Sequence, residues 1–241
     1  MPRTPRRSSL PNPASWASLR KVAAARKQEG HPNVVVDDQA AVGDQMLDKG
    51  FVGAMSLGID VERGTLRLLQ SGNGIRQDLS LISSDGTQTT WQQICTQRRD
   101  VVEVELVRLD PASEQGKGRG VLAYRNFLLW CDLAGVQQVA LEAGKDVGGY
   151  FWARCGFLPD AARWKAMCRD WQQQAQRAGN DDLLALLVAA SELGRIGLVT
   201  LARSDYAKSL LLHAQWRGLL DLTNPEQRDR ARQYAIHNPL S

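Results

Sequence analysis

The chain has 241 residues and a mass of 26.6 kDa, and 43% of its residues are hydrophobic. This length and composition allow a substantial core and exclude a disordered protein. The formal net charge is +4, but residues 1–30 hold seven basic residues against one acidic residue, a local excess of +6 that leaves −2 on the remainder. The basic character therefore belongs to the N-terminal segment and not to the whole fold.

The first residues predict a basic arm. Residues 1–13 are rich in Pro, Arg and Ser, a composition that buries little apolar surface, and Trp16 to Lys27 has the pattern of a short basic helix. We therefore expect residues 1–33 to form a flexible arm with a short helix. Residues 1–30 suit contact with nucleic acid or an acidic protein surface, and equally suit a solvated tail.

The sequence predicts neither a membrane segment nor a metal site. The chain lacks a run of about 18 apolar residues, and its basic start is not followed by an apolar signal core, so we expect a cytoplasmic protein without membrane contact. The cysteines contain no Cys-x-x-Cys pair and the histidines no ligand-spaced cluster, which predicts reduced, buried thiols and no metal site. The cysteines are Cys95, Cys131, Cys155 and Cys168.

Upstream of residue 101 the pattern predicts one helix followed by a meander of strands. The helix is expected near Gln39 to Asp48. Alternating apolar residues, interrupted by turns at Glu62-Arg63-Gly64 and at Ser71-Gly72-Asn73-Gly74, then favour short strands. The expected strands are Phe51 to Ile59, Thr65 to Leu69 and Ile75 to Ile82.

A basic glycine loop lies between a predicted strand, Val101 to Leu109, and a predicted helix, Val121 to Ala134. The loop residues are Gln115, Gly116, Lys117, Gly118, Arg119 and Gly120. Backbone N–H groups at a helix start are free to bind anions, and the helix dipole favours negative charge there. Glycines also let a diphosphate approach the main chain, and Lys117 and Arg119 add positive charge. The pattern therefore favours phosphate binding.

A second strand and a short helix follow this loop. Val136 to Ala143 predicts a strand, and Asp146 is a suitable N-cap for the helix after it. Gly156 suits the left-handed end of that helix, with Phe157 packing back against it. The resulting order is strand, glycine loop, helix, strand, helix and Gly-Phe.

With this order, residues 101–157 resemble the GNAT superfamily of acyl-CoA-dependent N-acyltransferases. Leu109-Asp110-Pro111 with Gln115, Gly118 and Gly120 matches the family's acetyl-CoA loop, and Gly156-Phe157 matches its later signature. The resemblance implies that main-chain N–H groups from Gln115 to Gly120 hold the pyrophosphate of acetyl-CoA. It also implies a pantetheine arm alongside Val107 to Leu109. The loop is not a Walker motif, because Lys117 is followed by Gly118 rather than Ser or Thr.

The resemblance implies an α/β (α+β) fold with a mixed, mainly antiparallel sheet flanked by helices, and a core over residues 34–157. Residues 158–241 depart from the family, because they predict a mainly helical elaboration in place of a strand hairpin. Only Ile196 to Leu201 has the pattern of a strand there. The expected helices are Asp160 to Ala178, Asp181 to Leu193, Asp205 to Leu219 and Asn224 to Tyr234.

Acyl transfer to an amine needs a base for the ammonium proton and an acid for the departing thiolate. Glu103 and Glu105 lie two apart on one strand and so share a face. The resemblance implies that one of them is the base; alternatively, both are solvated surface residues. The family's usual acid, a Tyr four residues before the Gly of Gly-Phe, is replaced here by Trp152. Tyr150 is the nearby candidate acid.

Two functions remain open from the sequence. The first is a GNAT-like N-acetyltransferase that transfers acetyl from acetyl-CoA to an unidentified amine. The second is a non-catalytic GNAT-like structural or interaction protein, such as a virion-associated or effector component. Trp152 favours the second function, whereas Gln115, Gly118 and Gly120 favour the first.

Overall fold

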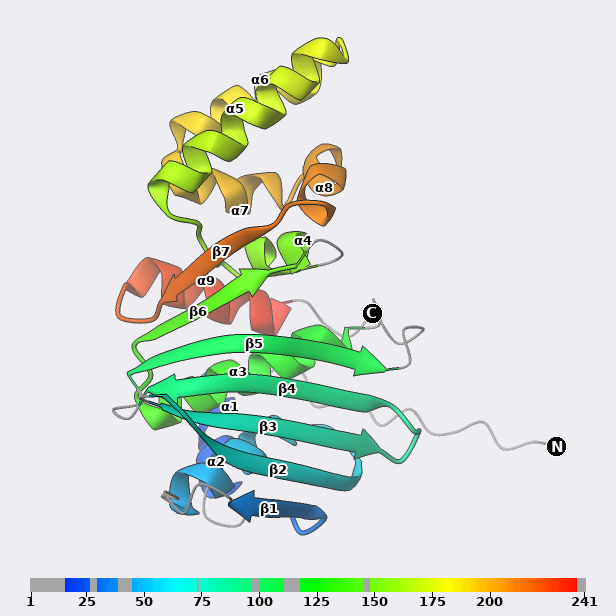
Figure 1. The fold of residues 1–241 in the computed structure, drawn as a ribbon, viewed down its shortest axis with the longest axis vertical. Coiled ribbons are helices and arrows are strands. Elements are labelled where there is room, and N and C mark those ends of the chain that lie inside the picture. Colours follow the sequence, from blue (N-terminus) through cyan, green and yellow to red (C-terminus); the bar gives the residue numbers. More distant parts are fainter. Residues whose placement is uncertain are drawn as a thin grey trace, which may run out of the picture.

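A computed structural model describes residues 16–26, 30–38, 45–72, 74–96, 100–110, 118–144 and 148–237. Over these ranges the protein is a mixed α/β fold with one seven-stranded sheet, whose strands lie in the order of the sequence (Figure 1). The strands are β1 (Val34–Asp38), β2 (Val61–Ser71), β3 (Gly74–Ser83), β4 (Gln88–Thr96), β5 (Val101–Asp110), β6 (Gln138–Ala143) and β7 (Trp216–Asp221).

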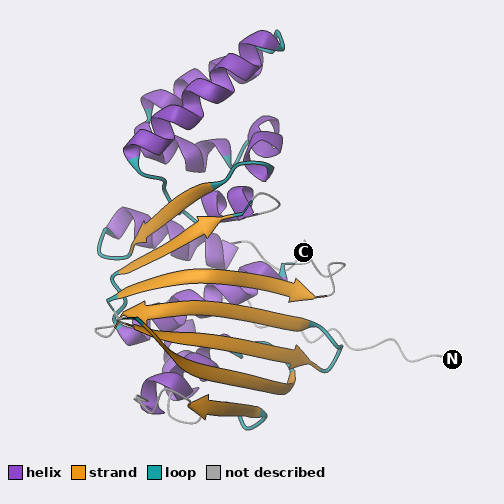
Figure 2. Cartoon of the chain, in the orientation of Figure 1, coloured by secondary structure: helices purple, strands orange, loops and turns teal. Residues whose placement is uncertain are grey.

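In the described part of the chain, helices precede the first strand, connect several of the strands and follow the last one. They are α1 (Trp16–Arg26), α2 (Gln45–Met55), α3 (Arg119–Ala134), α4 (Gly148–Arg154), α5 (Ala161–Arg177), α6 (Asp181–Glu192), α7 (Gly197–Leu201), α8 (Asp205–Leu212) and α9 (Pro225–His237), with a 3-10 turn at Gly194–Ile196. Figures 1 and 2 show α1, α2, α3 and α9 behind the sheet, whereas α5 to α8 lie beyond β7.

The sheet is mostly antiparallel. Strands β2, β3, β4 and β5 form an antiparallel meander, and β6 pairs antiparallel with β7. The pairs β1 with β2 and β5 with β6 are parallel. Parallel neighbours need a crossover connection, which α3 provides between β5 and β6. This places the start of α3 at the carboxyl end of β5.

Aromatic side chains join the helices to the sheet. The Trp91 ring of β4 lies 4.7 Å from the Phe127 ring of α3, and Phe51 of α2 meets Trp130 at 5.1 Å. All four side chains are buried. Beside them, buried Gln93 accepts a hydrogen bond from Trp91 Nε1 at 2.9 Å and donates to Gln77 Oε1 at 2.6 Å. Since these buried amides would lose their partners after a register slip, they fix the register of β3 on β4.

The basic helix expected near the N-terminus forms as α1 and is docked on the core. Trp16 Nε1 donates to Asp132 Oδ2 at 2.6 Å, and Arg232 of α9 pairs with the same carboxylate at 2.7 Å while standing over the Trp16 ring. Arg20 and Lys21 remain exposed. Residues 1–15 and 27–29 of the expected arm lie outside the described residues.

Two upstream predictions are wrong. Phe51 to Ile59 is not a strand, because α2 continues to Met55 and is buried all round over Phe51 to Met55, so this apolar run has no period that distinguishes a helix from a strand. The predicted Glu62-Arg63-Gly64 turn is also wrong, since these residues continue β2 through a register irregularity. A Cβ on Gly64 would lie 2.9 Å from Val34 Cγ2, so glycine serves close strand packing here. The expected start of a helix at residues 39–44 lies outside the described residues.

Two downstream predictions are also wrong. Ile196 to Leu201 is not a strand, because Gly197–Leu201 forms α7, where a Cβ on Gly197 would lie 1.9 Å from Ala190 O of α6. The helix expected from Asp205 to Leu219 ends at Leu212, and alternating burial along Trp216–Asp221 matches a strand on the sheet edge. The other expected elements from residue 74 onward are confirmed within a few residues, namely β3, β5, α3, β6, α4, α5, α6 and α9.

Asn126 provides a test of how α2 is attached to α3. Its buried side-chain amide donates to Met55 O at 3.0 Å and to Leu57 O at 2.8 Å, at the end of α2. Asn126→Ala leaves both carbonyls without this donor, so we expect the free energy of unfolding to fall by about 2–4 kcal/mol. Urea unfolding measures this change. Gln173→Ala, at an exposed position of α5, is the control and should change stability by less than about 0.5 kcal/mol.

Candidate functional site

The parallel pairing of β5 with β6 is short and ends inside both strands. Its ladder joins Val101–Val104 to Gln138–Leu141, although β5 continues to Asp110. On its other edge β5 has a register shift against β4, where Gln92 faces Leu106 and Gln93 faces Val104, so Glu105 is an extra residue. Such a bulge bends a strand. Beyond the ladder, β5 and β6 diverge toward their carboxyl ends (Figure 1).

Helix α3 begins at these diverging ends with a glycine in the left-handed region. Gly118 has φ 79° and ψ −6°, occupies the N-cap position and accepts a hydrogen bond from Leu122 N at 3.0 Å. Glycine has no side chain to cap the first-turn N–H groups, and this turn, which includes Gly120, contains no acidic residue. The positive end of the helix is thus suited to an anion. Gln115, Gly116 and Lys117 lie outside the described residues.

Arg119, the first residue of α3, forms an ion pair with Asp85 in the turn between β3 and β4. Asp85 also accepts a hydrogen bond from Thr87 N at 3.0 Å, and these contacts, that of Thr87 first, lower the pKa of the Asp85 carboxyl. The carboxylate offsets the charge of Arg119. The side chains described at this helix start therefore supply less net positive charge than the loop sequence alone indicates.

The two candidate bases lie on β5 and face arginines. Glu103 Oε1 is 3.6 Å from Arg217 Nη2 of β7, and Glu105 Oε2 is 3.2 Å from Arg76 Nη1 of β3. Arg76 also contacts Asp78 at 2.9 Å. Both glutamates are exposed. Either glutamate would have to share its carboxylate between an arginine and the proton of a substrate amine.

Val107 and Leu109, which the sequence expectation placed beside the pantetheine arm, follow the bulge in β5. Val107 is half-buried and pairs with Trp91 of β4, and Leu109 pairs with Thr89 near the end of β5. Both lie past the last residue that β5 shares with β6. They therefore occupy the diverging part of the strand, where the sequence expectation placed the pantetheine arm.

Tyr150, the candidate acid, and Trp152 both belong to α4 but lie in different environments. Trp152 is buried and packs against Phe151 at 4.8 Å and Phe157 at 5.3 Å. Tyr150 is half-buried, and its hydroxyl accepts a hydrogen bond from Arg154 Nη1 at 3.3 Å. Trp152 is therefore a core residue, whereas Tyr150 belongs to a polar, basic cluster.

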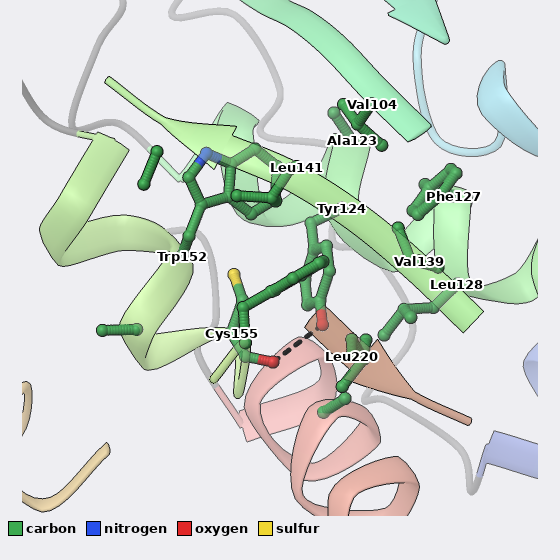
Figure 3. Close-up of a cluster of buried hydrophobic side chains, with 14 of the residues drawn as sticks. Val104, Ala123, Tyr124, Phe127, Leu128, Val139, Leu141, Trp152, Cys155 and Leu220 are labelled. Atoms are coloured by element: carbon green, nitrogen blue, oxygen red, sulfur yellow. Dashed lines mark hydrogen bonds between the residues drawn. The ribbon is translucent and has the colours of Figure 1, made fainter. Parts of the chain in front are cut away.

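Tyr124 fixes the end of α4 to α3. Its fully buried hydroxyl donates a hydrogen bond to Cys155 O at 2.8 Å (Figure 3). Gly156 follows with φ 94°, and the backbone N–H of buried Phe157 donates a hydrogen bond to Trp152 O at 3.1 Å. These two features confirm the expected Gly-Phe end of the helix. Burial raises the pKa of Tyr124 well above its ordinary value, so the hydroxyl remains a donor. Sequence reasoning missed this residue because one aromatic within an apolar helix carries no distinguishing signal.

A pocket of about 420 Å³ lies between α4, the residues after α7, and α9. Its lining residues are Arg154, Arg203, Gln233, Tyr234 and His237. Sequence reasoning missed this site too, because its residues come from three separate segments without a local motif. The described part of the chain contains no group of three or more His, Cys, Asp or Glu placed to hold a metal ion.

Comparison with known proteins assigns no family to this chain, because no protein-family model matches it and no curated protein sequence matches it significantly. The described residues thus define a mixed α/β fold with a mostly antiparallel seven-stranded sheet. None of the helices within the described ranges has the length and apolarity needed to cross a membrane.

Tyr124 allows a test by pH. The raised pKa means that the folded protein keeps a proton that the unfolded chain loses near pH 10, so this stabilisation is complete below about pH 10 and disappears as the pH rises through the folded-state pKa. Tyr124→Phe should reduce the loss of unfolding free energy above about pH 10 by up to about 1.4 kcal/mol per pH unit. Urea unfolding between about pH 9 and pH 11 measures the slope. Tyr206→Phe, at an exposed position, should leave it unchanged.

Proposed function

We propose that the protein is a GNAT-like N-acetyltransferase that transfers an acetyl group from acetyl-CoA to an amine. The observation that carries this proposal is the parallel pair β5 and β6, which diverges after four residue pairs where the glycine start of α3 begins. A strand edge that has left its neighbour offers main-chain groups to the two amides of an extended pantetheine arm. The neighbouring helix start suits the diphosphate of the same molecule.

In this proposal the coenzyme follows β5 and ends at α3. The pantetheine arm runs along Val107 to Leu109, and main-chain N–H groups from Gln115 to Gly120 hold the pyrophosphate. The contact between Arg119 and Asp85 is relevant here, because a diphosphate at the helix start competes with Asp85 for the guanidinium. Coenzyme binding and the β3–β4 turn are therefore coupled through one arginine.

The proposed reaction balances as one acyl transfer and two proton transfers. The amine nitrogen attacks the thioester carbonyl, Glu103 or Glu105 accepts the ammonium proton directly or through water, and the C–S bond breaks. The departing thiolate takes a proton from Tyr150 or from solvent. Since each glutamate faces an arginine, the base would have to leave this partner before it accepts the proton of the amine. We further propose a cytoplasmic location.

A non-catalytic GNAT-like structural or interaction protein is the second candidate. It is favoured by the buried indole of Trp152, which leaves no titratable group at the family's acid position, and by the ion pairs of both glutamates. In that case the basic residues 1–30 and the C-terminal helices would contact an acidic protein or nucleic acid in a virion-associated or effector assembly. Turnover distinguishes this candidate from the first.

Gly118 gives the sharpest test of coenzyme binding. Asn and Asp both tolerate the left-handed conformation better than other side chains do, so Gly118→Asn and Gly118→Asp differ mainly in charge. Gly118→Asp should weaken acetyl-CoA binding at least about tenfold relative to Gly118→Asn, because a carboxylate would lie at the diphosphate position. Isothermal titration with acetyl-CoA and with free coenzyme A measures both affinities. Equal affinities in the two variants would remove the coenzyme from this position.

Turnover is tested by replacing the candidate bases. Glu103→Gln or Glu105→Gln should lower kcat by about 100-fold at neutral pH while acetyl-CoA affinity stays near that of the unsubstituted protein, as expected for loss of a general base. Coenzyme release on a panel of amines gives the rates. Glu62→Gln, an exposed position of β2, is the control with the same change of charge and should leave kcat unchanged.

The two functions predict different results for the amine panel. An acetyltransferase acetylates at least one class among peptides, polyamines and small amines, and Trp152→Tyr preserves or raises that rate. Coenzyme binding without acetylation of any amine would contradict catalysis and favour the interaction protein. If both glutamate variants kept full activity, another group would have to be the base.

A further inference from the structure

Strand β1 forms an edge of the sheet that the described residues leave open. It pairs with β2 alone, and Figure 1 shows it as the outermost strand, at the opposite end of the sheet from β7. The outer edge of β7 is partly occupied, because Leu158 and Leu219 exchange backbone hydrogen bonds of 3.0 and 2.9 Å. No described residue forms such a bridge to the outer edge of β1. The two edges of the sheet therefore differ in what they can still bind.

Main-chain groups of β1 point outward at this edge. Gly64 N of β2 donates to Asn33 O at 2.9 Å, so the carbonyl of Asn33 faces β2. Because main-chain groups alternate in direction along a strand, the carbonyl of Val34 and both the N–H and the C=O of Val36 face away from β2. The N–H of Val34 donates to His31 O at 3.0 Å. The edge thus offers the N–H of Val36 and the carbonyls of Val34 and Val36 to another strand.

The side chains at this edge are apolar and β-branched. Val35 is 66% exposed and Val36 is 41% exposed, while Val34 packs against the core. Charged residues and prolines commonly protect an edge strand from pairing, but neither occurs among these valines. Valine also favours the extended conformation. The valine edge of β1, Val34–Val36, is therefore suited to the addition of a further strand.

We propose that the valine edge pairs antiparallel with the valine edge of a second copy of this chain, about a two-fold axis between the two Val35 residues. In this register Val35 lies opposite Val35, and Val34 lies opposite Val36 of the other copy, so every valine meets a valine. The main chain agrees with this register, because the N–H of Val36 faces the outward carbonyl of Val34 in the other copy. The two-fold symmetry repeats this hydrogen bond. The valine edge is thus complementary to itself.

Charge favours this orientation over a parallel one. Antiparallel pairing places Asp37 of each copy beside Asn33 of the other, whereas an in-register parallel pairing would place the two Asp37 residues side by side. A strand of different sequence would need apolar residues at the matching positions, and a second copy supplies them by symmetry. Strands β2, β3 and β4 separate this edge from β5 and β6, so the inference does not depend on the proposed function.

Val35→Cys tests the register directly in the full chain. Opposite residues of a non-hydrogen-bonded antiparallel pair have Cα atoms about 4.5 Å apart, which a disulfide can span. The native cysteines are all buried, so the introduced thiol is the accessible one. We expect an added oxidant to convert most of this variant into a disulfide-linked dimer on non-reducing gels. Val188→Cys, at a 44% exposed position of α6, is the control and should remain largely uncrosslinked.

Sedimentation equilibrium measures the association without a crosslink. Val35→Lys and Val35→Glu each place like charges opposite each other at the two-fold axis, so each variant should dimerise at least about tenfold more weakly than the unsubstituted chain. An equal mixture of the two variants should regain dimers, because the introduced lysine then faces the introduced glutamate. Val188→Lys should leave the association unchanged.

A chain that stays monomeric up to about 0.1 mM would overturn the proposal and assign the valine edge to a different occupant. Equal effects of Val35→Lys and Val188→Lys would overturn it as well, since the dimer would then use another surface. A mixture of Val35→Lys and Val35→Glu that stays monomeric would contradict the pairing of Val35 with itself.

Discussion

The short parallel ladder between β5 and β6 is the constraint on which the rest of the arrangement depends. Four residue pairs join these strands, fewer than at any other junction of the described sheet, and they connect the antiparallel meander to β6 and β7. The crossover that parallel pairing demands brings the start of α3 to the carboxyl end of β5, and the bulge at Glu105 lets β5 turn away from β6. Strands β5 and β6 are therefore paired at one end and separated at the other, and the candidate site lies at the separated end.

The candidate site is better prepared for binding than for proton transfer. Two features suited to an anion lie at the start of α3, namely the left-handed Gly118 and a first turn without acidic residues. The groups proposed for proton transfer are instead engaged, since Glu103 and Glu105 face arginines and Tyr150 accepts from Arg154. A bound substrate has to rearrange these contacts before chemistry, and a diphosphate at the start of α3 has to compete with Asp85 for Arg119.

The sequence predicted those parts of the fold whose local pattern and tertiary role agree. Strand β5 alternates apolar and charged residues from Val102 to Leu106, α3 begins at a glycine and ends at one, and Gly156 closes α4. Residues 51–55 and 197–201 were misassigned because short apolar runs fit a helix or a strand equally well, and only packing decides between them. At the site, the sequence motif identified Gly118 as part of the glycine loop before α3. The ion pair of Arg119 with Asp85 and the pocket at Arg203 were not predicted, because they depend on contacts between distant segments that no local pattern encodes.

The helices α5 to α8 leave the sheet and return to it at nearly the same place. Leu158 bridges to Leu219 of β7, and Arg163 Nη2 donates to Gln215 O at 2.6 Å just before that strand. The excursion is thus closed at its base, so the pairing of β6 with β7 does not depend on the path that the chain takes between Leu158 and Gln215. Close backbone contacts nevertheless constrain the excursion. A Cβ on Gly149 would lie 2.3 Å from Leu211 O, and one on Gly197 would lie 1.9 Å from Ala190 O, so the backbones touch at both places and any variation in the excursion must preserve these contacts.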